Sequence, residues 1–263
     1  MTAVALQIMQ TLCSILFACK KKDTTPQKDN FSFSAFGQSD TGKINLTGEA
    51  YFDKTNKKLI LNDAVPTPEH SYHTGTGHAY YNRLVDVADG FETSFNFTIS
   101  DLGGIPDVDG NEGGDGLAFA IFNSDTTKIK DNTWYIGMEN SIAIEFDTYN
   151  NGDDGGGVAN HDDLDGNHIA MYYCTASTSN VSTRMAINAS VADFSSAGTH
   201  TVKIIYQNKK INVYLDGALS LEANIDLSSV LTLNSGKAYI DLIGYSGASG
   251  ETHKINNWSF KSY

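Results

Sequence analysis

The chain has 263 residues, of which 40 % are hydrophobic and 19 % are charged, and its formal net charge is −13. This composition excludes a disordered or collagen-like chain, and the acidic balance argues against nucleic acid, whose phosphates require a basic surface. Aromatic residues, Thr, Ser, Asn and Gly are plentiful and Pro is scarce, which is typical of strands joined by turns. We therefore expect an all-β protein with one large core, and the clustered carboxylates suggest bound cations.

The N-terminal segment has the features of an exported leader. No charged side chain occurs in residues 1–18, and the apolar stretch that ends at Phe17 is too short to span a bilayer comfortably. The run Leu16-Phe17-Ala18-Cys19 resembles the lipobox of bacterial lipoproteins, whose cysteine becomes the first residue and is acylated. We expect a signal peptide over residues 1–18, a lipid on Cys19 and a polar tether over residues 19–30. The protein would then lie on the bacterial cell envelope, attached to the membrane only through its lipid. An uncleaved anchor helix is the alternative, which the lysines of residues 20–22 disfavour by lying on the wrong flank.

Short apolar or alternating segments follow the tether and are separated by Gly, Asn and Asp. They cover residues 31–36, 91–99, 117–122, 142–147, 168–173, 201–206, 211–215, 237–244 and 255–260. The segments 201–206 and 211–215 lie close enough together to predict a hairpin. No stretch has the pattern of a long amphipathic helix. The sequence therefore predicts a single β-sandwich domain over residues 31–263.

The segment Ile142–Tyr149 is the most informative part of the chain. On a strand, Glu145, Asp147 and Tyr149 share one face, because side chains two residues apart point the same way. Asn151, Asp163 and His168 follow through a loop rich in Gly and Asp. Carboxylates with a histidine suit Mn²⁺ or Zn²⁺, whereas carboxylates with amide and carbonyl oxygens suit Ca²⁺. From the spacing alone, a solvated acidic loop remains the alternative.

The remaining histidines and the last cysteine give weaker signals. His70, His73, His78 and His161 lack the spacing of metal ligands, so we expect them on surface loops. Cys174 is the only cysteine after Cys19, which leaves no intrachain disulfide in the exported domain, and we expect a buried, unreactive thiol.

Several motifs, taken together, resemble the legume-type (L-type) lectin family. In chain order they are Phe31–Phe36, Leu46–Ala50, Gly77–Tyr81, Phe91–Phe97, Gly114–Ala120, Glu145–Tyr149 with Asn151, Asp163 and His168, Gly244–Gly250, and Trp258–Phe260. Each motif is weak by itself, but their order along nearly the whole chain is that of the family. The resemblance implies an all-β, concanavalin A-like jelly-roll sandwich that binds carbohydrate and is not an enzyme.

The resemblance also implies which residues form the site. Glu145, Asp147, Asp163 and His168 would hold a transition metal, expected to be Mn²⁺, and Asp147, the Tyr149 carbonyl, Asn151 and Asp163 would hold Ca²⁺. Asp115 and Asn151 would bind sugar hydroxyls and the Tyr149 ring would cover the sugar's C–H face. In the family the peptide bond before the sugar-binding Asp is cis, which points to Gly114–Asp115. Trp134 stands where the family usually has Gly, so it is a candidate sugar contact that leaves the specificity open. The expected partners are glycans or glycoconjugates, and pairing of the back sheet with a second copy is left open.

Two other functions are weighed against a lectin. A laminarinase-like glycoside hydrolase needs a nucleophile and an acid carboxyl about 5 to 5.5 Å apart. Glu145 and Asp147 begin that enzyme pattern, but Asn150 and Asn151 occupy the positions of its second Glu. The third possibility is an adhesive scaffold of the same fold that binds no sugar, against which the presence of Asp115 and Asn151 argues.

Overall fold

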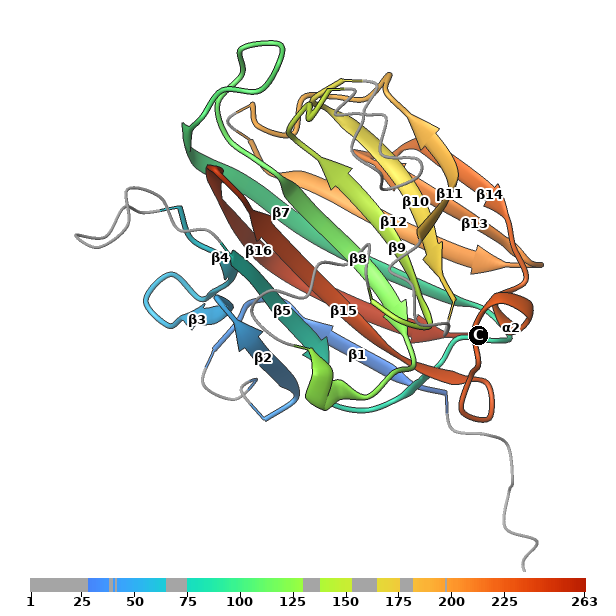
Figure 1. The fold of residues 1–263 in the computed structure, drawn as a ribbon. Coiled ribbons are helices and arrows are strands. Elements are labelled where there is room, and N and C mark those ends of the chain that lie inside the picture. The colour runs from blue at the N-terminus through green and yellow to red at the C-terminus, as the bar shows by residue number, and fades with distance from the viewer. Residues whose placement is uncertain are drawn as a thin grey trace, which may run out of the picture.

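The computed structural model describes residues 28–37, 40, 42–64, 75–129, 138–152, 165–175, 182–196 and 198–263. In this part of the chain two eight-stranded sheets pack against each other, as Figure 1 shows. Neighbouring strands are antiparallel, and each strand segment expected from the sequence overlaps one of them. The predicted all-β sandwich is therefore present.

The back sheet has the strand order β14-β13-β12-β7-β16-β4-β3, with β1 also paired to β16. Its members are β1 (Asn30–Phe33), β3 (Tyr51–Asp53), β4 (Lys58–Asn62), β7 (Phe91–Gly104), β12 (His200–Gln207), β13 (Lys210–Leu215), β14 (Ala218–Asn224) and β16 (Ser249–Ser262). The expected hairpin is β12 and β13, in which Gln207 pairs with Lys210. Both turn residues between them have positive φ angles, which suits a tight hairpin.

The front sheet has the strand order β11-β10-β9-β8-β15-β5-β2, with β6 also paired to β15. Its members are β2 (Ile44–Gly48), β5 (Gly75–Tyr81), β6 (Val85–Asp86), β8 (Gly116–Phe122), β9 (Ser141–Asp147), β10 (His168–Cys174), β11 (Ser182–Asn188) and β15 (Lys237–Ser246). The described helices are short: the 3₁₀ turn η1 (Thr126–Lys128) and the α-helix α2 (Leu227–Val230). None of them could cross a lipid bilayer.

The main core lies between the sheets. Strand β7 shows why, because Phe91, Phe95, Phe97 and Ile99 alternate with half-exposed polar residues and all four point inward. Trp258 of β16 is fully buried beside them, and its indole N–H donates to the Thr93 hydroxyl at 3.0 Å. Because the side chain is buried and its N–H already has a partner in the core, Trp258 has a structural role.

The central strands of the front sheet are buried on both faces. Every residue of β8 and β9 is buried, and a second apolar cluster that includes Ala118, Phe122, Ala143 and Tyr172 lies on the face turned away from the main core. A strand that is covered on both faces has a nearly continuous apolar sequence, which explains why apolar and polar residues do not alternate in β8 and β9. Polar side chains on this outer face are consequently shielded from bulk water.

One expectation from the sequence is wrong. His78 does not lie on a surface loop; it lies in β5, is fully buried, and its Nδ1 is 2.7 Å from the Asp241 carboxylate. Burial is compatible with this polar side chain because Asp241, on the neighbouring strand β15, provides a hydrogen-bond partner. His70, His73 and His161 lie outside the described residues. Cys174 is a buried free thiol, as expected, and burial raises its pKa.

Candidate functional site

The candidate site lies where four strands of the front sheet end or begin. Tyr245 of β15 pairs with Gly116, Gly116 pairs with Asp147 of β9, and Asp147 pairs with His168 of β10. Because adjacent strands are antiparallel, the start of β8 and β10 meets the end of β9 at the same edge of the sheet. Asp115, which directly precedes β8, is thereby brought to the edge that carries Asp147 and His168.

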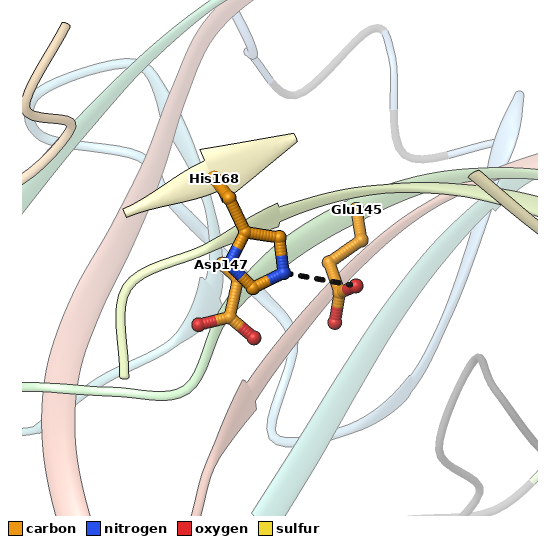
Figure 2. Close-up of side chains that lie close together, drawn as sticks. All are labelled: Glu145, Asp147 and His168. Atoms are coloured by element: carbon orange, nitrogen blue, oxygen red, sulfur yellow. Dashed lines mark ion pairs between the residues drawn. The ribbon is translucent and has the colours of Figure 1, made fainter. Parts of the chain in front are cut away.

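Glu145, Asp147 and His168 form a buried cluster on the outer face of the front sheet, shown in Figure 2. One possible ligand atom from each residue lies within 4.8 Å of the others, and the three residues are at most 4 % exposed. Burial and the nearby Glu145 carboxylate raise the pKa of Tyr172, so its phenol stays neutral beside the cluster. The interpretation of this segment as a solvated acidic loop does not apply to these three side chains.

The orientation of the His168 ring fits a metal ligand. Its Nδ1 is 3.0 Å from the backbone carbonyl oxygen of Asp165, which can only accept, so Nδ1 carries the proton. Nε2 faces Glu145 Oε2 at 4.0 Å and makes no hydrogen bond within the described residues. When Nε2 carries no proton, it presents a lone pair toward that carboxylate. Two acceptors that face each other beyond hydrogen-bond distance leave room for a cation between them. Metal-binding histidines commonly donate their second ring N–H to a backbone carbonyl.

Asp115 follows a cis peptide bond, Gly114–Asp115, as the resemblance implied. Its N–H donates to the Tyr245 carbonyl at 2.9 Å. Its carboxylate lies against Gly247, where an added Cβ would be 2.9 Å from Asp115 Oδ2. The Tyr149 ring covers Gly114, since a Cβ on that glycine would be 2.8 Å from the ring. Burial and the charges of Asp115 and Asp107 raise the pKa of Tyr149, so the phenol stays neutral.

The other predicted site residues are placed as follows. Asn151 is exposed and follows Tyr149 and the buried Asn150 on the segment that leaves β9. Trp134, Asp163 and Cys19 lie outside the described residues. The structure therefore brings together Glu145, Asp147 and His168 directly, and places Asp115 and Tyr149 beside each other at the same sheet edge.

Asp107 is a residue of this site that sequence reasoning did not assign. Its buried carboxylate accepts backbone N–H bonds from Asp109, Asn111 and Asn150, so it ties the loop before β8 to the segment after β9. Burial alone would raise the pKa of Asp107, but these hydrogen bonds outweigh it and hold the pKa below its ordinary value. The signal in the sequence is an Asp followed by polar turn residues, which does not reveal the distant partner.

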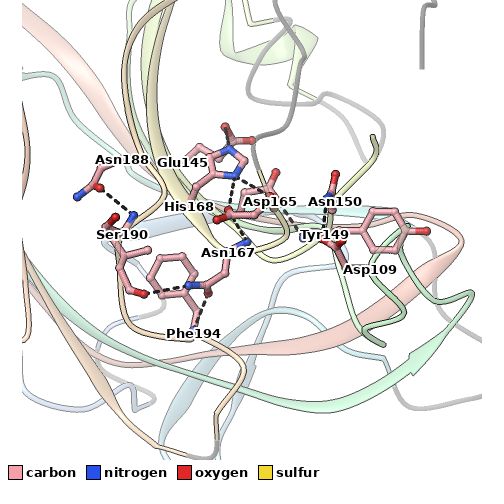
Figure 3. Close-up of polar contacts among 12 residues, drawn as sticks. Asp109, Glu145, Tyr149, Asn150, Asp165, Asn167, His168, Asn188, Ser190 and Phe194 are labelled. Atoms are coloured by element: carbon pink, nitrogen blue, oxygen red, sulfur yellow. Dashed lines mark hydrogen bonds and ion pairs between the residues drawn. The ribbon is translucent and has the colours of Figure 1, made fainter. Parts of the chain in front are cut away.

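The side chains of Asn150 and Asn167 make hydrogen bonds that hold the segments after β9 and before β10 in place, as Figure 3 shows. The Asn150 amide donates to Asp109 Oδ2 at 2.7 Å, so the position where a hydrolase would need its acid carboxyl has a structural role. The Asn167 amide donates to the Ala192 carbonyl at 2.9 Å, and its oxygen accepts the Phe194 N–H at 2.9 Å. Asn167 directly precedes His168, so these bonds hold the start of β10 against the connection between β11 and β12.

Glu251 of β16 contacts the site from the back sheet through a hydrogen bond with Thr148. The sequence did not reveal this residue either. It is fully buried, and its Oε1 accepts the Thr148 hydroxyl at 2.5 Å and lies 2.8 Å from His253 Nε2. The other nitrogen of the His253 ring contacts the Asn62 side chain. Thr148 stands between Asp147 and Tyr149, so this network connects the back sheet to the segment that carries both.

Comparison with known proteins assigns the family. The legume lectin domain family matches residues 28–263, which is more than half of the chain. The chain belongs to the legume lectin family. Its predicted jelly-roll fold is likewise confirmed by a winged bean acidic lectin complexed with methyl-α-D-galactose, which has a TM-score of 0.65 and 25 % identity over 90 % of this chain and 98 % of that one.

This legume lectin domain also resembles curated plant proteins. A probable L-type lectin-domain containing receptor kinase S.7 from Arabidopsis thaliana is 31 % identical over 89 % of the chain. The chain spans about a third (34 %) of that kinase's length. A 2-acetamido-2-deoxy-D-galactose-binding seed lectin 2 from Cytisus scoparius is 27 % identical over 89 % of the chain and 96 % of its own length. The relatives are thus lectins and lectin domains of receptors.

Proposed function

We propose that this legume lectin domain binds carbohydrate through Asp115, and that binding depends on divalent cations held next to it. The observation that carries the proposal is the shared sheet edge: Asp115 precedes β8 directly beside Asp147 and His168, whose cluster has the donor atoms of a metal site. The names of the seed lectin from Cytisus and the winged bean complex refer to galactose-type sugars, which supports a saccharide as the ligand.

Each site residue has a proposed role in this function. Glu145, Asp147, Asp163 and His168 would hold a transition metal, Mn²⁺ by preference, because carboxylates and imidazole suit that ion. Asp147, Asp163, Asn151 and the Tyr149 carbonyl would hold Ca²⁺, which prefers oxygen ligands. Bound there, the cations would offset the mutual repulsion of the carboxylates.

The contacts with the sugar come from this chain's own side chains. Asp115 accepts hydrogen bonds from two neighbouring hydroxyls, the Asn151 amide donates to the sugar, and the Tyr149 ring lies against its C–H face. Trp134 is a further candidate contact from the sequence motif alone, and the sugar specificity is left open. The protein carries no proposed catalytic residue, because Asn150 replaces the acid that hydrolysis would require.

A glycan array, followed by isothermal titration calorimetry on the sugars it identifies, tests this function. We expect binding in Ca²⁺ and Mn²⁺, loss of binding in chelator, and at least about a hundredfold loss for Asp115→Asn, which removes a charge-assisted acceptor. Glu222→Gln is the matched control, since Glu222 is a half-exposed carboxylate on β14 that pairs with Lys210. Affinity that is unchanged in chelator, or in Asp115→Asn, contradicts the proposal.

We also propose that the domain is displayed on a bacterial cell envelope by a lipid on Cys19. The support is the sequence alone: an uncharged leader, Leu16-Phe17-Ala18-Cys19, and a polar tether. Expression in a bacterial host, followed by mass spectrometry of the N-terminal peptide, should find an acylated cysteine that is absent from Cys19→Ser. A chain whose first residues remain uncleaved would contradict this proposal.

Pairing of the back sheet with a second copy is tested by sedimentation velocity, in which a dimer is expected to dissociate on dilution.

A further inference from the structure

The Glu251 carboxylate makes hydrogen bonds through only one of its two oxygens within the described residues. Oε1 accepts the Thr148 hydroxyl and lies 2.8 Å from His253 Nε2, whereas Oε2 is buried and makes no such bond. A buried carboxylate oxygen without a partner costs free energy, because it has lost its hydrogen bonds to water. Stability alone therefore does not account for this carboxylate.

The second oxygen of Glu251 faces the segment that leads into Asp115. A Cβ added to Gly113 would be 2.9 Å from Glu251 Oε2, so the carboxylate lies against the backbone two residues before Asp115. The same Cβ would be 2.6 Å from a methyl group of Leu102, on β7. Two side chains of the back sheet thus confine the start of the Asp115 segment.

The backbone of Glu251 also connects to the hairpin after β15. The Asn62 amide donates to the Glu251 carbonyl oxygen at 3.2 Å and to Ser246 Oγ at 2.5 Å. Ser246 directly precedes Gly247, which lies against the Asp115 carboxylate. The hairpin that borders Asp115 is therefore held through the same residue as the segment before it.

Glu251 consequently contacts, directly or through one side chain, three segments around the candidate sugar site. They are the segment before β8, the segment after β9 that carries Tyr149, and the hairpin after β15. The polar side chains that make these contacts are all at most 4 % exposed: Asn62, Thr148, Ser246, Glu251 and His253. Hydrogen bonds in such a buried, connected network reinforce one another, so one member cannot shift alone.

We propose that Glu251 is a positioning residue for carbohydrate binding, which sets the distance between the Asp115 carboxylate and the Tyr149 ring without touching the sugar. This inference rests on the proposed function, in which both groups contact the sugar. A small displacement of either group weakens the hydrogen bonds or the ring contact, because binding groups must be held within about 0.5 Å of their productive positions. Substitutions that act through neighbouring residues change a coupling by about two- to thirtyfold.

Calorimetric titration of methyl glycosides tests the positioning role. The glycosides of galactose, N-acetylgalactosamine, mannose and fucose are titrated into the full chain with Ca²⁺ and Mn²⁺, at a temperature where circular dichroism shows every variant to be folded. For each sugar that the parent protein binds, Glu251→Gln should weaken the affinity about tenfold. Ser246→Ala keeps the carboxylate and disturbs only the hairpin, so it should weaken the affinity about threefold.

Asp241→Asn is the matched control. Asp241 is also a fully buried carboxylate paired with a histidine, His78 at 2.7 Å, but it lies in the middle of β15, away from the segments around Asp115. This variant should lower the Tm and leave the affinity for the sugar unchanged. An unchanged affinity in Glu251→Gln overturns the inference. An equal loss in Asp241→Asn also overturns it, since general loosening of the fold would then explain both results.

A double-mutant cycle with Thr148→Val tests the route by which Glu251 acts. Because the Thr148 hydroxyl bonds to Glu251, the losses of sugar affinity from the two substitutions should not add. In the Thr148→Val background, Glu251→Gln should weaken the affinity by only about threefold or less. Fully additive losses contradict the positioning role. Failure of the parent protein to bind any of the methyl glycosides counts against the proposed function itself, and the positioning role falls with it.

Discussion

Among single residues, Thr148 and Glu251 connect the site to the opposite sheet. The Thr148 hydroxyl and the Glu251 carboxylate are both buried, so neither group can exchange its hydrogen bond for one to water. Thr148→Val keeps the shape of the side chain and removes the donor. We expect it to lower the free energy of unfolding by about 1 to 2 kcal/mol, since a buried acceptor loses a hydrogen bond.

Urea denaturation measures the effect of Thr148→Val. Thr201→Val is the control, because Thr201 is exposed on β12 and a surface substitution usually changes stability by less than about 0.5 kcal/mol. Equal midpoints for the two variants would show that the hydrogen bond between the sheets contributes nothing measurable.

Asp216 gives a pH dependence away from the site. Partial burial raises its pKa, but the Thr201 N–H at 2.8 Å and the His200 ring at 2.8 Å outweigh burial and hold the pKa below the ordinary 3.8. A carboxyl with a lowered folded pKa stabilises the native state above its unfolded pKa, and this contribution disappears as the pH falls through the folded value. Its stabilising effect should thus be complete at pH 5 and lost well below pH 3.8.

Asp216→Asn tests this dependence. At pH 5 the variant should unfold at lower urea than the parent protein, and at pH 2.5 the two should converge. A gap in the unfolding midpoint that persists at pH 2.5 would mean that the side chain acts through its shape or its neutral hydrogen bonds rather than through its charge.

The residues of the site differ in how far the sequence predicts them. Glu145, Asp147 and His168 were predictable, because alternation on a strand places the two carboxylates on one face and the next strand begins at the histidine. Asp107 and Glu251 were not, because each depends on a partner in a loop or strand far along the chain. His78 was misassigned for the same reason, since its partner lies on β15, 163 residues away.

At the scale of the strands, close backbone approach determines where β5 can lie. A Cβ on Gly77 would be 1.5 Å from the Leu61 carbonyl oxygen and 2.9 Å from the Ala50 nitrogen. Backbone atoms cannot move aside as a flexible side chain can. Gly77→Ala should therefore push β5 away from β4 and cost at least about 3 kcal/mol, the upper end of overpacking effects.

The thermal midpoint of Gly77→Ala is compared with that of Gly42→Ala, whose added methyl group meets nothing within 4 Å. The control should melt within a few degrees of the parent protein, while Gly77→Ala should lose about 6 °C or more. A mild effect of Gly77→Ala would indicate that the two sheets can separate locally at little cost.

Strands were easier to predict when one face met solvent. The segments in β7, β12 and β13 alternate visibly, whereas β8 and β9 are buried on both faces and were recognised as continuous apolar runs. The short strands β3 and β6 carry too few residues for any period to show. Their positions depend on pairing with β4 and β15, which only the assembled sheet reveals.

For the whole molecule, the net charge of −13 makes stability sensitive to cations. An ion that binds only the folded state stabilises it by about 2.7 kcal/mol at a concentration one hundred times its Kd. For a chain of this size we expect chelation to lower the Tm by about 5 to 10 °C. Differential scanning calorimetry with Ca²⁺ and Mn²⁺, and again in chelator, measures this shift.

Two controls separate specific ion binding from charge screening. Mg²⁺ at the same ionic strength screens equally but needs octahedral geometry, so it should restore little of the lost Tm. His168→Gln should lose the gain from Mn²⁺ while still unfolding cooperatively. Melting curves that coincide in chelator and in Mn²⁺ would exclude a stabilising metal at the cluster.

Strand β16 has the highest residue numbers of any described strand, yet it lies in the interior of the back sheet, between β7 and β4. During synthesis on the ribosome, β7 must wait for more than a hundred further residues before this neighbour emerges. Until then its inward-facing phenylalanines have no completed layer to cover them. Chaperones that shield nascent apolar segments should therefore engage this polypeptide through most of its translation, and release it only once the segment near Trp258 has left the exit tunnel.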